Sequence, residues 1–327
     1  MKLNNSLPRL SANFSGVFRL TGRTVEFDQY GSPYIKLRLS NCDTDYIAGL
    51  DADNATMLES IGYLDQVTAS GAKCSKNSLG LDVKLHEIHL ASRDEVNMQP
   101  FLNSIPRTYC PTPESLDKLV ASVRSLKSVH LKNFIRRVIE RRDRLEGFLN
   151  APASRSHHHA YRGGLLEHSL EVARNVVTMI KLNEPDMPRT LLELGFVAGL
   201  LHDIGKTFTY DSKGKPTSAW SLCEHDALTL EACAIALAYL DRHEPELAIT
   251  LRHIWTCASP GARYGVRPAT TLARYVRDAD AQSAASNKFS QVFRKSKPGL
   301  KKNGIETFWL PKTNSTNCKF ETESTVN

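Results

Sequence analysis

The chain has 327 residues, of which 41% are hydrophobic and 24% are charged, proportions typical of a globular protein large enough for two domains. No apolar run approaches the roughly 18 residues of a membrane-spanning helix, and the opening MKLNNSLPRLSANF lacks the apolar core of a signal peptide. The seven cysteines are scattered without a CxxC pair, which argues against a disulfide framework and a thiolate zinc site and favours a cytoplasmic protein. The net charge of +7 favours an anionic partner, most commonly nucleic acid.

Residues 14–91 have the pattern of short strands with one helix. FSGVFRLTGRTVEF and the turn DQYGSP precede YIKLRLS, and DYIAGL, a helix-like DNATMLESIG and two more strands, LDQVTASGAKC and LGLDVKLHEIHL, follow. This order predicts an OB-fold-like small β-barrel over residues 10–92. In YIKLRLS, Ile35, Leu37 and Leu39 fall on one face, and Tyr34, Lys36 and Arg38 on the other. That polar face either binds single-stranded nucleic acid by stacking and phosphate contact or is an ordinary solvated surface.

Residues 93–150 combine a proline-rich stretch with amphipathic helices. The prolines of NMQPFLNSIPRTYCPTP indicate a linker. From Glu114 to Asn150 apolar residues recur at helical spacing, and the basic residues between them are Lys132, Arg136, Arg137, Arg141, Arg142 and Arg144. We expect helices with a basic outer face, which is either a track for nucleic acid or a solvated face.

The rest of the chain is predicted to be helical up to a basic tail. Residues 151–290 hold Leu, Ala and Val at spacings of three and four with little strand signal, so we expect an all-helical domain there. Residues 291–327, with seven Lys and Arg against three Asp and Glu, are expected to be a flexible tail in which FWL at 308–310 could dock. The predicted fold is therefore multidomain, a β-barrel followed by an all-α domain.

Metal-ligand residues recur along the predicted helices. They are His168 in GLLEHSLEVA, His202 and Asp203 in VAGLLHDIGK, His225 in SLCEHDALTLEA, His253 in AITLRHIWT and Asp280 in YVRDADAQS. Imidazole nitrogens and carboxylate oxygens together suit divalent transition metals, and the lack of a thiolate argues against a closed structural zinc site. Gly205 could end the helix before it, and Lys206 follows closely enough to meet a phosphate near the metal.

The motifs GGLLEHSLEVA and LLHDIGK with the downstream Asp280 resemble the HD superfamily of metal-dependent phosphohydrolases, which are all-helical. This resemblance implies that His168, His202, Asp203 and Asp280 are the ligands, with Asp278 as the alternative to Asp280; the AD-x-x-S context favours Asp280. By the same resemblance, His225 and His253 match the two additional histidines of members that hold two metals.

A barrel, a helical connector and APASRSHHHAYRGGLLEHSLEVA in this order resemble the YhaM family of bacterial 3′→5′ exonucleases over most of residues 10–285. The HD part is also similar to that of MobH-type relaxases, including PAS-x-x-HHHA, AD-x-x-S and the stretch TFTYDSKGKPTSAW. The histidine cluster precedes the helix near Gly164, so His158 and His159 are either substrate contacts or supporting surface residues. Arg162 and Lys206 are expected to stabilise charge on phosphate oxygens.

These patterns lead to the hypothesis of a metal-dependent 3′→5′ exonuclease of single-stranded DNA or RNA. Two divalent ions about 3.5–4 Å apart, most readily manganese but also Fe, Co, Ni, Mg or Zn, would carry the hydrolysis, with Asp203 and Lys206 as catalytic residues. The alternatives are a phosphohydrolase of dNTPs or cyclic nucleotides, and a non-catalytic or relaxase-related accessory protein of a mobile element. The sequence has no GxxxxGK[ST] loop and no GxSxG elbow. No membrane partner is expected, and the resemblance implies a homo-oligomer.

Overall fold

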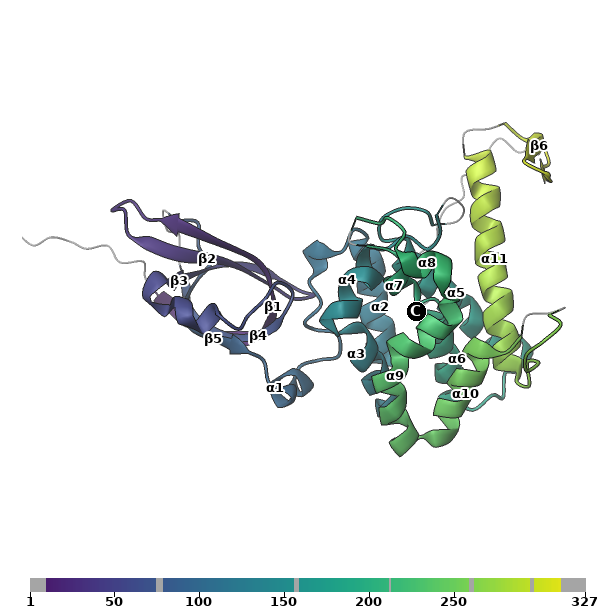
Figure 1. The fold of residues 1–327 in the computed structure, drawn as a ribbon, viewed down its shortest axis with the longest axis horizontal. Helices are drawn as coiled ribbons and strands as arrows, with labels where there is room; N and C mark the ends of the chain where they lie inside the picture. Colours follow the sequence, from purple (N-terminus) through teal and green to yellow (C-terminus); the bar gives the residue numbers. More distant parts are fainter. Residues whose placement is uncertain are drawn as a thin grey trace, which may run out of the picture.

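The computed structural model describes residues 10–74, 79–155, 159–211, 213–258, 262–294 and 297–312. Five strands form a sheet at the N-terminal end, and a body of helices follows it along the long axis of the molecule (Figure 1). The strands of this sheet are β1 (Leu10–Phe27), β2 (Pro33–Ser40), β3 (Asp45–Asp51), β4 (Gln66–Cys74) and β5 (Val83–Leu90). None of the helices in the described ranges is both long and apolar enough to cross a membrane.

The strand pairings of this sheet form a ring. The long strand β1 pairs antiparallel with β4 through its first half and with β2 through its second, and its register to β2 shifts between Leu20 and Gly22. β2 pairs with β3 and β4 with β5, both antiparallel, while a short parallel contact joins β3 to β5. Every strand therefore has two neighbours, in the cyclic order β1-β2-β3-β5-β4.

The alternation in β2 is confirmed on one face and wrong at one position of the other. Ile35, Leu37 and Leu39 are buried in the barrel core. Tyr34, expected on an open polar face, is only 8% exposed, and its hydroxyl donates to a Glu26 carboxylate oxygen 2.9 Å away on the paired strand. The helix expected at residues 53–62 is the 3₁₀ helix η1 (Ala52–Leu58).

Short helices and turns connect the barrel to the helical body, in the segment expected to be a linker. The connecting elements are α1 (Arg93–Met98) and η2 (Arg107–Tyr109). The helices of the body are α2 (Pro113–Ser125), α3 (Val129–Ile139), α4 (Arg142–Asn150), α5 (Gly164–Asn183), α6 (Arg189–Leu201), α7 (Lys206–Thr209), α8 (Ser218–Leu222), α9 (His225–His243), α10 (Pro245–Thr256) and α11 (Thr271–Phe293). One hydrophobic core joins α2–α4 to the later helices, so the apolar packing does not divide at residue 150.

The basic residues expected on an outer face of the connector helices are not all there. Arg136 on α3 is buried, and its guanidinium lies 4.2 Å from the centre of the Phe101 ring. Arg144 on α4 stacks in the same way on Phe208, at 3.6 Å. Arginine can pack its planar group on an aromatic ring, so these two side chains contribute to the interior as well as to the charge.

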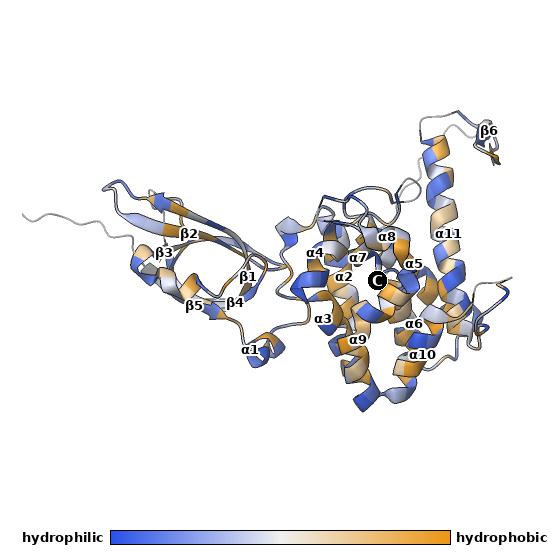
Figure 2. Cartoon of the chain, viewed as in Figure 1, coloured by the Kyte–Doolittle hydropathy of each residue, from blue (hydrophilic) through white to orange (hydrophobic). Residues whose placement is uncertain are grey.

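Helix α6 lies at the centre of the helical body. Every residue from Glu193 to Leu201 is buried, as expected for the mostly apolar LELGFVAGLL. Other helices of the body carry both hydrophobic and hydrophilic residues (Figure 2). Gly199 lets α5 approach closely, since a Cβ at this position would lie 3.0 Å from the Cα of Ala173. The packing of α5 against α6 fixes the separation of the segments that carry His168 and His202.

Residues 291–294 and 297–312, at the start of the tail that was expected to be flexible, include regular secondary structure. Helix α11 continues to Phe293, and β6 (Gly299–Asn303) pairs antiparallel with β7 (Glu306–Leu310). Phe308 from the FWL motif lies edge-on to Phe289 of α11, with ring centres 6.4 Å apart. The hairpin thus packs through the residue expected to dock, while residues 313–327 lie outside the described part of the chain.

Candidate metal centre

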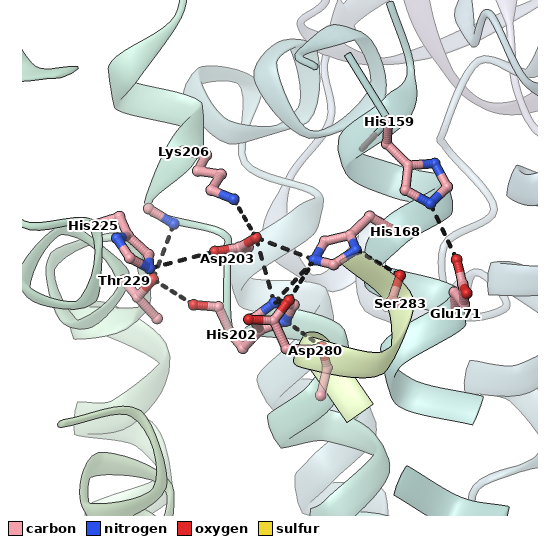
Figure 3. A network of polar contacts seen from close by, with 12 residues as sticks. His159, His168, Glu171, His202, Asp203, Lys206, His225, Thr229, Asp280 and Ser283 are labelled. Atoms are coloured by element: carbon pink, nitrogen blue, oxygen red, sulfur yellow. Dashed lines mark hydrogen bonds and ion pairs between the residues drawn. The ribbon is translucent and has the colours of Figure 1, made fainter. Parts of the chain in front are cut away.

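Three segments bring four donor side chains together in the helical body (Figure 3). α5 carries His168 on its buried face, where the side chain is fully inaccessible. α6 ends at Leu201, so His202 and Asp203 occupy the turn that follows it. α11 packs against α5 and adds Asp280. The packing of these three segments places the four donor side chains around one point.

The separations between these donor atoms match those of ligands around one ion. Nε2 of His168 lies 3.3 Å from Nε2 of His202, 3.4 Å from Oδ2 of Asp203 and 3.1 Å from Oδ1 of Asp280. Nε2 of His202 lies 3.3 Å from Oδ2 of Asp203 and 3.6 Å from Oδ1 of Asp280. Adjacent ligands held about 2.0–2.2 Å from a divalent ion are roughly 2.8–3.6 Å apart, so the donor set fits such an ion. The donor atoms of His168, His202 and Asp280 all lie within 4.8 Å of one another, and Asp203 adjoins this group through the two imidazoles.

Hydrogen bonds on the far side of each imidazole orient it toward the centre. Nδ1 of His202 lies 2.8 Å from the carbonyl oxygen of Gly199, which can only accept, so a neutral His202 carries its proton on Nδ1 and presents the lone pair of Nε2. Nδ1 of His168 lies 3.1 Å from the hydroxyl of Ser283, which in turn bonds to the carboxylate of Glu171. Partners of this kind fix the tautomer and ring orientation of metal-ligating histidines.

The charges around the centre favour a positive ion. Burial lowers the pKa of His202, but the carboxylates of Asp203 and Asp280 outweigh it and raise that pKa to about 10. Burial would raise the pKa of Asp203, yet the charges of Lys206 and His202 hold it well below its usual range. Two carboxylates that stay ionised in a buried cluster need a cation beside them, and a metal ion at Nε2 of His202 would replace the proton.

The turn after α6 is also held against α7 and α9. Nζ of Lys206 lies 2.5 Å from Oδ2 of Asp203, so the lysine expected to meet a phosphate is ion-paired with a candidate ligand. His225, the first residue of α9, places Nε2 3.7 Å from the other oxygen of Asp203. Thr229 accepts a hydrogen bond from the N–H of Gly205 and donates one to the carbonyl of His202. These bonds fix the backbone that carries both candidate ligands.

His253 lies apart from the donor cluster, and His159 lies beside it. Nε2 of His253 accepts a hydrogen bond from the N–H of Ala269 at 2.9 Å, and within the described residues no recorded contact joins His253 to the cluster. His159 is buried, with Nδ1 2.8 Å from the Tyr161 hydroxyl and Nε2 3.1 Å from Glu171. Its ring lies 5.7 Å from that of His168, so it supports the cluster from the side instead of facing an open substrate surface. His158 lies outside the described residues.

The other predicted contacts lie at a pocket and on the barrel. Arg162 is exposed, donates to the Asn150 side chain at 2.8 Å and lines a pocket near the cluster. Lys36 is ion-paired with Glu26 at 3.2 Å, and Arg38 is exposed on the barrel surface. Asp278, the alternative to Asp280, is exposed on α11 and is absent from the donor cluster.

Sequence reasoning missed the residues that support the cluster. These are Glu171, Thr229 and Ser283, together with Tyr210 and Trp220 on a neighbouring pocket. Ser283 had a signal, since it is the serine of AD-x-x-S, one helical turn after Asp280. Glu171 follows His168 by three residues, which places both on one side of α5. Thr229 belongs to another helix, and nothing local marks it.

The chain is similar to curated exonucleases, as the motifs predicted. It is 24% identical over 277 residues to the 3′-5′ exoribonuclease YhaM of Bacillus subtilis, which covers 82% of this chain and 84% of the relative. It is 23% identical over 314 residues to YhaM of Oceanobacillus iheyensis, with coverages of 91% and 92%, and 23% identical over 222 residues to YhaM of Listeria welshimeri, with coverages of 66% and 68%. The resemblance to this family is confirmed.

Two further comparisons concern parts of the chain. A family model, TraI_2, described as a putative helicase, matches residues 112–221, consistent with the relaxase-like similarity of this region. The barrel region is similar to a mitochondrial single-stranded DNA binding protein, Rim1 of S. cerevisiae, at 15% identity. That match covers 25% of this chain and 96% of Rim1 with a TM-score of 0.22, too low to decide the fold.

Proposed function

We propose that the protein is a metal-dependent nuclease that shortens single-stranded nucleic acid from its 3′ end. The observation that carries this proposal is the cluster of His168, His202, Asp203 and Asp280, whose donor atoms are spaced like the ligands of one divalent ion. The similarity to 3′-5′ exoribonucleases supports phosphodiester hydrolysis and its polarity. Cleavage assays with RNA and DNA in parallel decide which of the two is the substrate.

The residues around the cluster support hydrolysis of a phosphodiester. A bound divalent ion would supply Lewis-acid polarisation of phosphoryl oxygens and acidify water at neutral pH. Asp203 would hold the ion with one oxygen and face His225 with the other. The ammonium of Lys206, on the wall of the adjoining pocket, would neutralise negative charge on the substrate. We therefore assign Asp203 and Lys206 the catalytic roles.

We infer a first centre built from these four ligands, while a second ion depends on two further histidines. His225 is within 3.7 Å of Asp203, but His253 would first have to release the N–H of Ala269. The stoichiometry of manganese, measured by inductively coupled plasma mass spectrometry after gel filtration, separates one bound ion from two. Manganese, iron, cobalt, nickel, magnesium and zinc are the ions to compare.

We also infer that residues 10–92 form an OB-fold that holds the strand while residues 151–290 carry the cutting site. The cyclic strand order with a parallel β3–β5 contact supports the first part. Exposed Arg38, and Lys36 beside Glu26, are the barrel residues to which we assign phosphate contacts. The six cysteines of the described residues form no disulfide, which supports a cytoplasmic location.

The decisive experiment incubates the protein with manganese and 5′-labelled single-stranded RNA or DNA. We expect a ladder that shortens from the 3′ end, protection by a 3′ block, and arrest by EDTA. Asp280→Asn should lower the cleavage rate by at least about 100-fold, because a neutral amide replaces a charged ligand. Asp278→Asn is the matched control, since it makes the same change two residues away on an exposed face of α11.

Two results would contradict this function. Substrates of both kinds that stay intact with every tested metal would rule out a nuclease. Cleavage by Asp280→Asn at the rate of Asp278→Asn would rule out the assigned centre. Chromatography of dNTPs and cyclic nucleotides in the same reactions tests the alternative of a nucleotide phosphohydrolase.

The match to a model described as a putative helicase favours a second candidate, a nucleic-acid protein related to relaxases. The matched residues 112–221 include His168, His202 and Asp203 but not Asp280. A supercoiled plasmid incubated with the protein and manganese distinguishes the two: a relaxase-like protein would produce a nicked circle, whereas an enzyme requiring a 3′ end would leave the plasmid intact.

A further inference from the structure

A pocket of about 310 Å³ adjoins the candidate centre. Its lining includes Lys206 and His225, which both contact Asp203, together with Tyr210, Trp220 and Cys223. This volume is within the range of small-molecule sites, about 300–1,000 Å³. A group bound here would contact Lys206 and His225, the two residues through which the pocket adjoins the Asp203 carboxylate.

Trp220 presents a large aromatic surface on the wall of this pocket. Its side chain, on the short helix α8, is 43% exposed although it could bury one of the largest apolar surfaces of any residue. The guanidinium of Arg155 lies 5.8 Å from the centre of its ring. An exposed indole beside a cation is the combination on which nucleic-acid bases stack in single-strand binding proteins.

A second pocket, of about 400 Å³, shares Tyr210 with the first. Tyr210 lines both pockets, and Arg155 lines the second while it lies over the indole of the first. Arg155, Arg162 and Lys213 on this wall take part in no ion pair with a carboxylate among the described residues. Three cations that have no carboxylate partner in the described part of the chain attract an anionic ligand, and phosphates are the anions that accompany bases.

Hydrogen bonds connect the described residues between α7 and α8, which contribute to the lining of both pockets. A carboxylate oxygen of Asp211 accepts hydrogen bonds from the N–H groups of Lys213 at 2.9 Å and Lys215 at 2.8 Å. Tyr210 and Pro216 form a β-bridge in the same segment. This segment belongs to the TFTYDSKGKPTSAW stretch and lies within the region matched by the putative-helicase model.

We propose that the two pockets are consecutive nucleotide subsites. Trp220 stacks on the base at the 3′ end of a single strand, beside the metal cluster. Arg155, Arg162 and Lys213 bind the phosphates of the nucleotides that precede it. The direction of the strand in this assignment rests on the proposed nuclease activity. The assignment predicts that the helical body binds the end of a strand in preference to its interior.

The test measures equilibrium binding without cleavage. The probes are a fluorescein-labelled single-stranded decamer with a 3′ hydroxyl, as RNA and as DNA, and a circular single strand that has no end, all in EDTA. Trp220→Ala should weaken binding of the linear decamer by about 5- to 100-fold, the loss of one stacked base, and should leave binding of the circle unchanged. Trp220→Phe should restore most of the affinity. Trp309→Ala is the matched control, an exposed tryptophan on β7.

Alkylation of Cys223 gives a second readout on the unmutated protein. This cysteine is exposed and lines the first pocket, so the linear decamer should slow its labelling by iodoacetamide severalfold, as followed by peptide mass spectrometry, and the circle should not. The subsites are refuted if Trp220→Ala binds the decamer as wild type does, or if the decamer leaves the Cys223 rate unchanged. Wild-type cleavage combined with either result rejects the subsites alone. Absence of cleavage with Trp220-dependent end binding rejects the nuclease alone.

Discussion

The side chains of the candidate centre are oriented by their neighbours to different degrees. Both imidazoles are fixed through Nδ1, His202 by a backbone carbonyl and His168 by a serine hydroxyl. Asp203 is buried between Lys206 and the two imidazoles, whereas the side chain of Asp280 is 45% exposed. Donors that are oriented before an ion arrives lose little conformational freedom on binding, so we expect the exposed Asp280 side chain to be the ligand that adjusts most when an ion binds.

The hydroxyl of Ser283 allows a test of how the His168 imidazole is oriented. Ser283→Ala removes the group between His168 and Glu171, so His168 can turn and the affinity for manganese should fall by about 10- to 100-fold. Isothermal titration calorimetry with manganese measures the change. Because the hydroxyl acts through His168, Ser283 is a positioning residue and not a ligand.

Two variants separate positioning from a general loss of structure. Ser283→Thr keeps the hydroxyl and should recover most of the manganese affinity. Ser286→Ala, an exposed serine one helical turn later on α11, should bind manganese as wild type does. Equal affinity of Ser283→Ala and Ser286→Ala would show that the orientation of His168 does not depend on this hydrogen bond.

The reason for a glycine at position 205 could not be predicted from the motif alone. The sequence predicted a glycine that ends a helix, but its φ of −58° is open to any residue. Its actual requirement is space: a Cβ would lie 2.4 Å from the carbonyl oxygen of His225 and 2.6 Å from the N–H nitrogen of Thr229. The partner is a helix about twenty residues further along the chain, and local sequence carries no information about that approach.

At the scale of elements, periodicity predicted the burial of apolar residues better than it predicted the contacts of polar residues. The two-residue period placed Ile35, Leu37 and Leu39 in the core, because a strand exposes alternate faces. The same period left Tyr34 on the other face, yet pairing of β1 with β2 brings Glu26 to its hydroxyl and buries it. The candidate ligands were predicted from the resemblance of their motifs to a known family, whereas Glu171 and Trp220 are ordinary residue types whose contacts depend on tertiary neighbours.

Glu193 joins two helices and provides a test at this scale. The buried carboxylate on α6 accepts hydrogen bonds from the N–H groups of Lys127 and Ser128, just before α3, and from Arg189. Burial would raise the pKa of Glu193, but these donors outweigh it and lower that pKa below the ordinary 4.5. Glu193→Gln should reduce the free energy of unfolding at pH 7 by about 1–3 kcal/mol, because an amide cannot accept all three bonds.

The pH dependence follows from the sign of this shift. A carboxylate with a lowered pKa in the folded state contributes its stability above about pH 4.5 and loses it as the pH falls through the folded value. The difference between wild type and Glu193→Gln in urea unfolding should therefore be full at pH 7 and shrink steadily below pH 4.5. Glu231→Gln, at an exposed position on α9, is the control. A difference that stays constant down to pH 3 would contradict the role of the ionised carboxylate.

At the scale of the whole molecule, polar contacts hold the barrel against the connecting segment and against α4 of the helical body. Gln66 on β4 donates to Ser104 at 2.7 Å, and the N–H of Cys42 donates to the carbonyl of Asn103 at 2.9 Å. Arg142 on α4 pairs with Asp65 at 3.1 Å. Composition predicted two parts and a linker, but not these contacts, since each joins residues that are far apart in sequence and of unremarkable type.

Arg19 is the centre of this junction. It lies on β1, is 1% exposed, and donates to the carbonyl of Leu64 at 2.7 Å and to that of Glu140, at the end of α3, at 2.5 Å. Its guanidinium also faces the buried carboxylate of Glu140, whose pKa burial raises despite the charges of Arg136 and Arg19. The side chain therefore satisfies buried oxygens from both parts of the molecule at once.

Arg19→Leu should loosen the barrel from the helical body as well as destabilise the fold. Two buried carbonyls lose their donor and Glu140 loses a counter-charge, so the free energy of unfolding should fall by about 2–5 kcal/mol. Limited proteolysis should cut within residues 91–112 faster than in wild type, because the connecting elements no longer lie against a fixed barrel. Arg23→Leu, an exposed arginine four residues along β1, should match wild type in both measurements. Equal cleavage of the connector in all three proteins would contradict this role of Arg19. The chain between the two parts would then set their relative position, and a strand bound by the barrel would reach the metal cluster over a variable path.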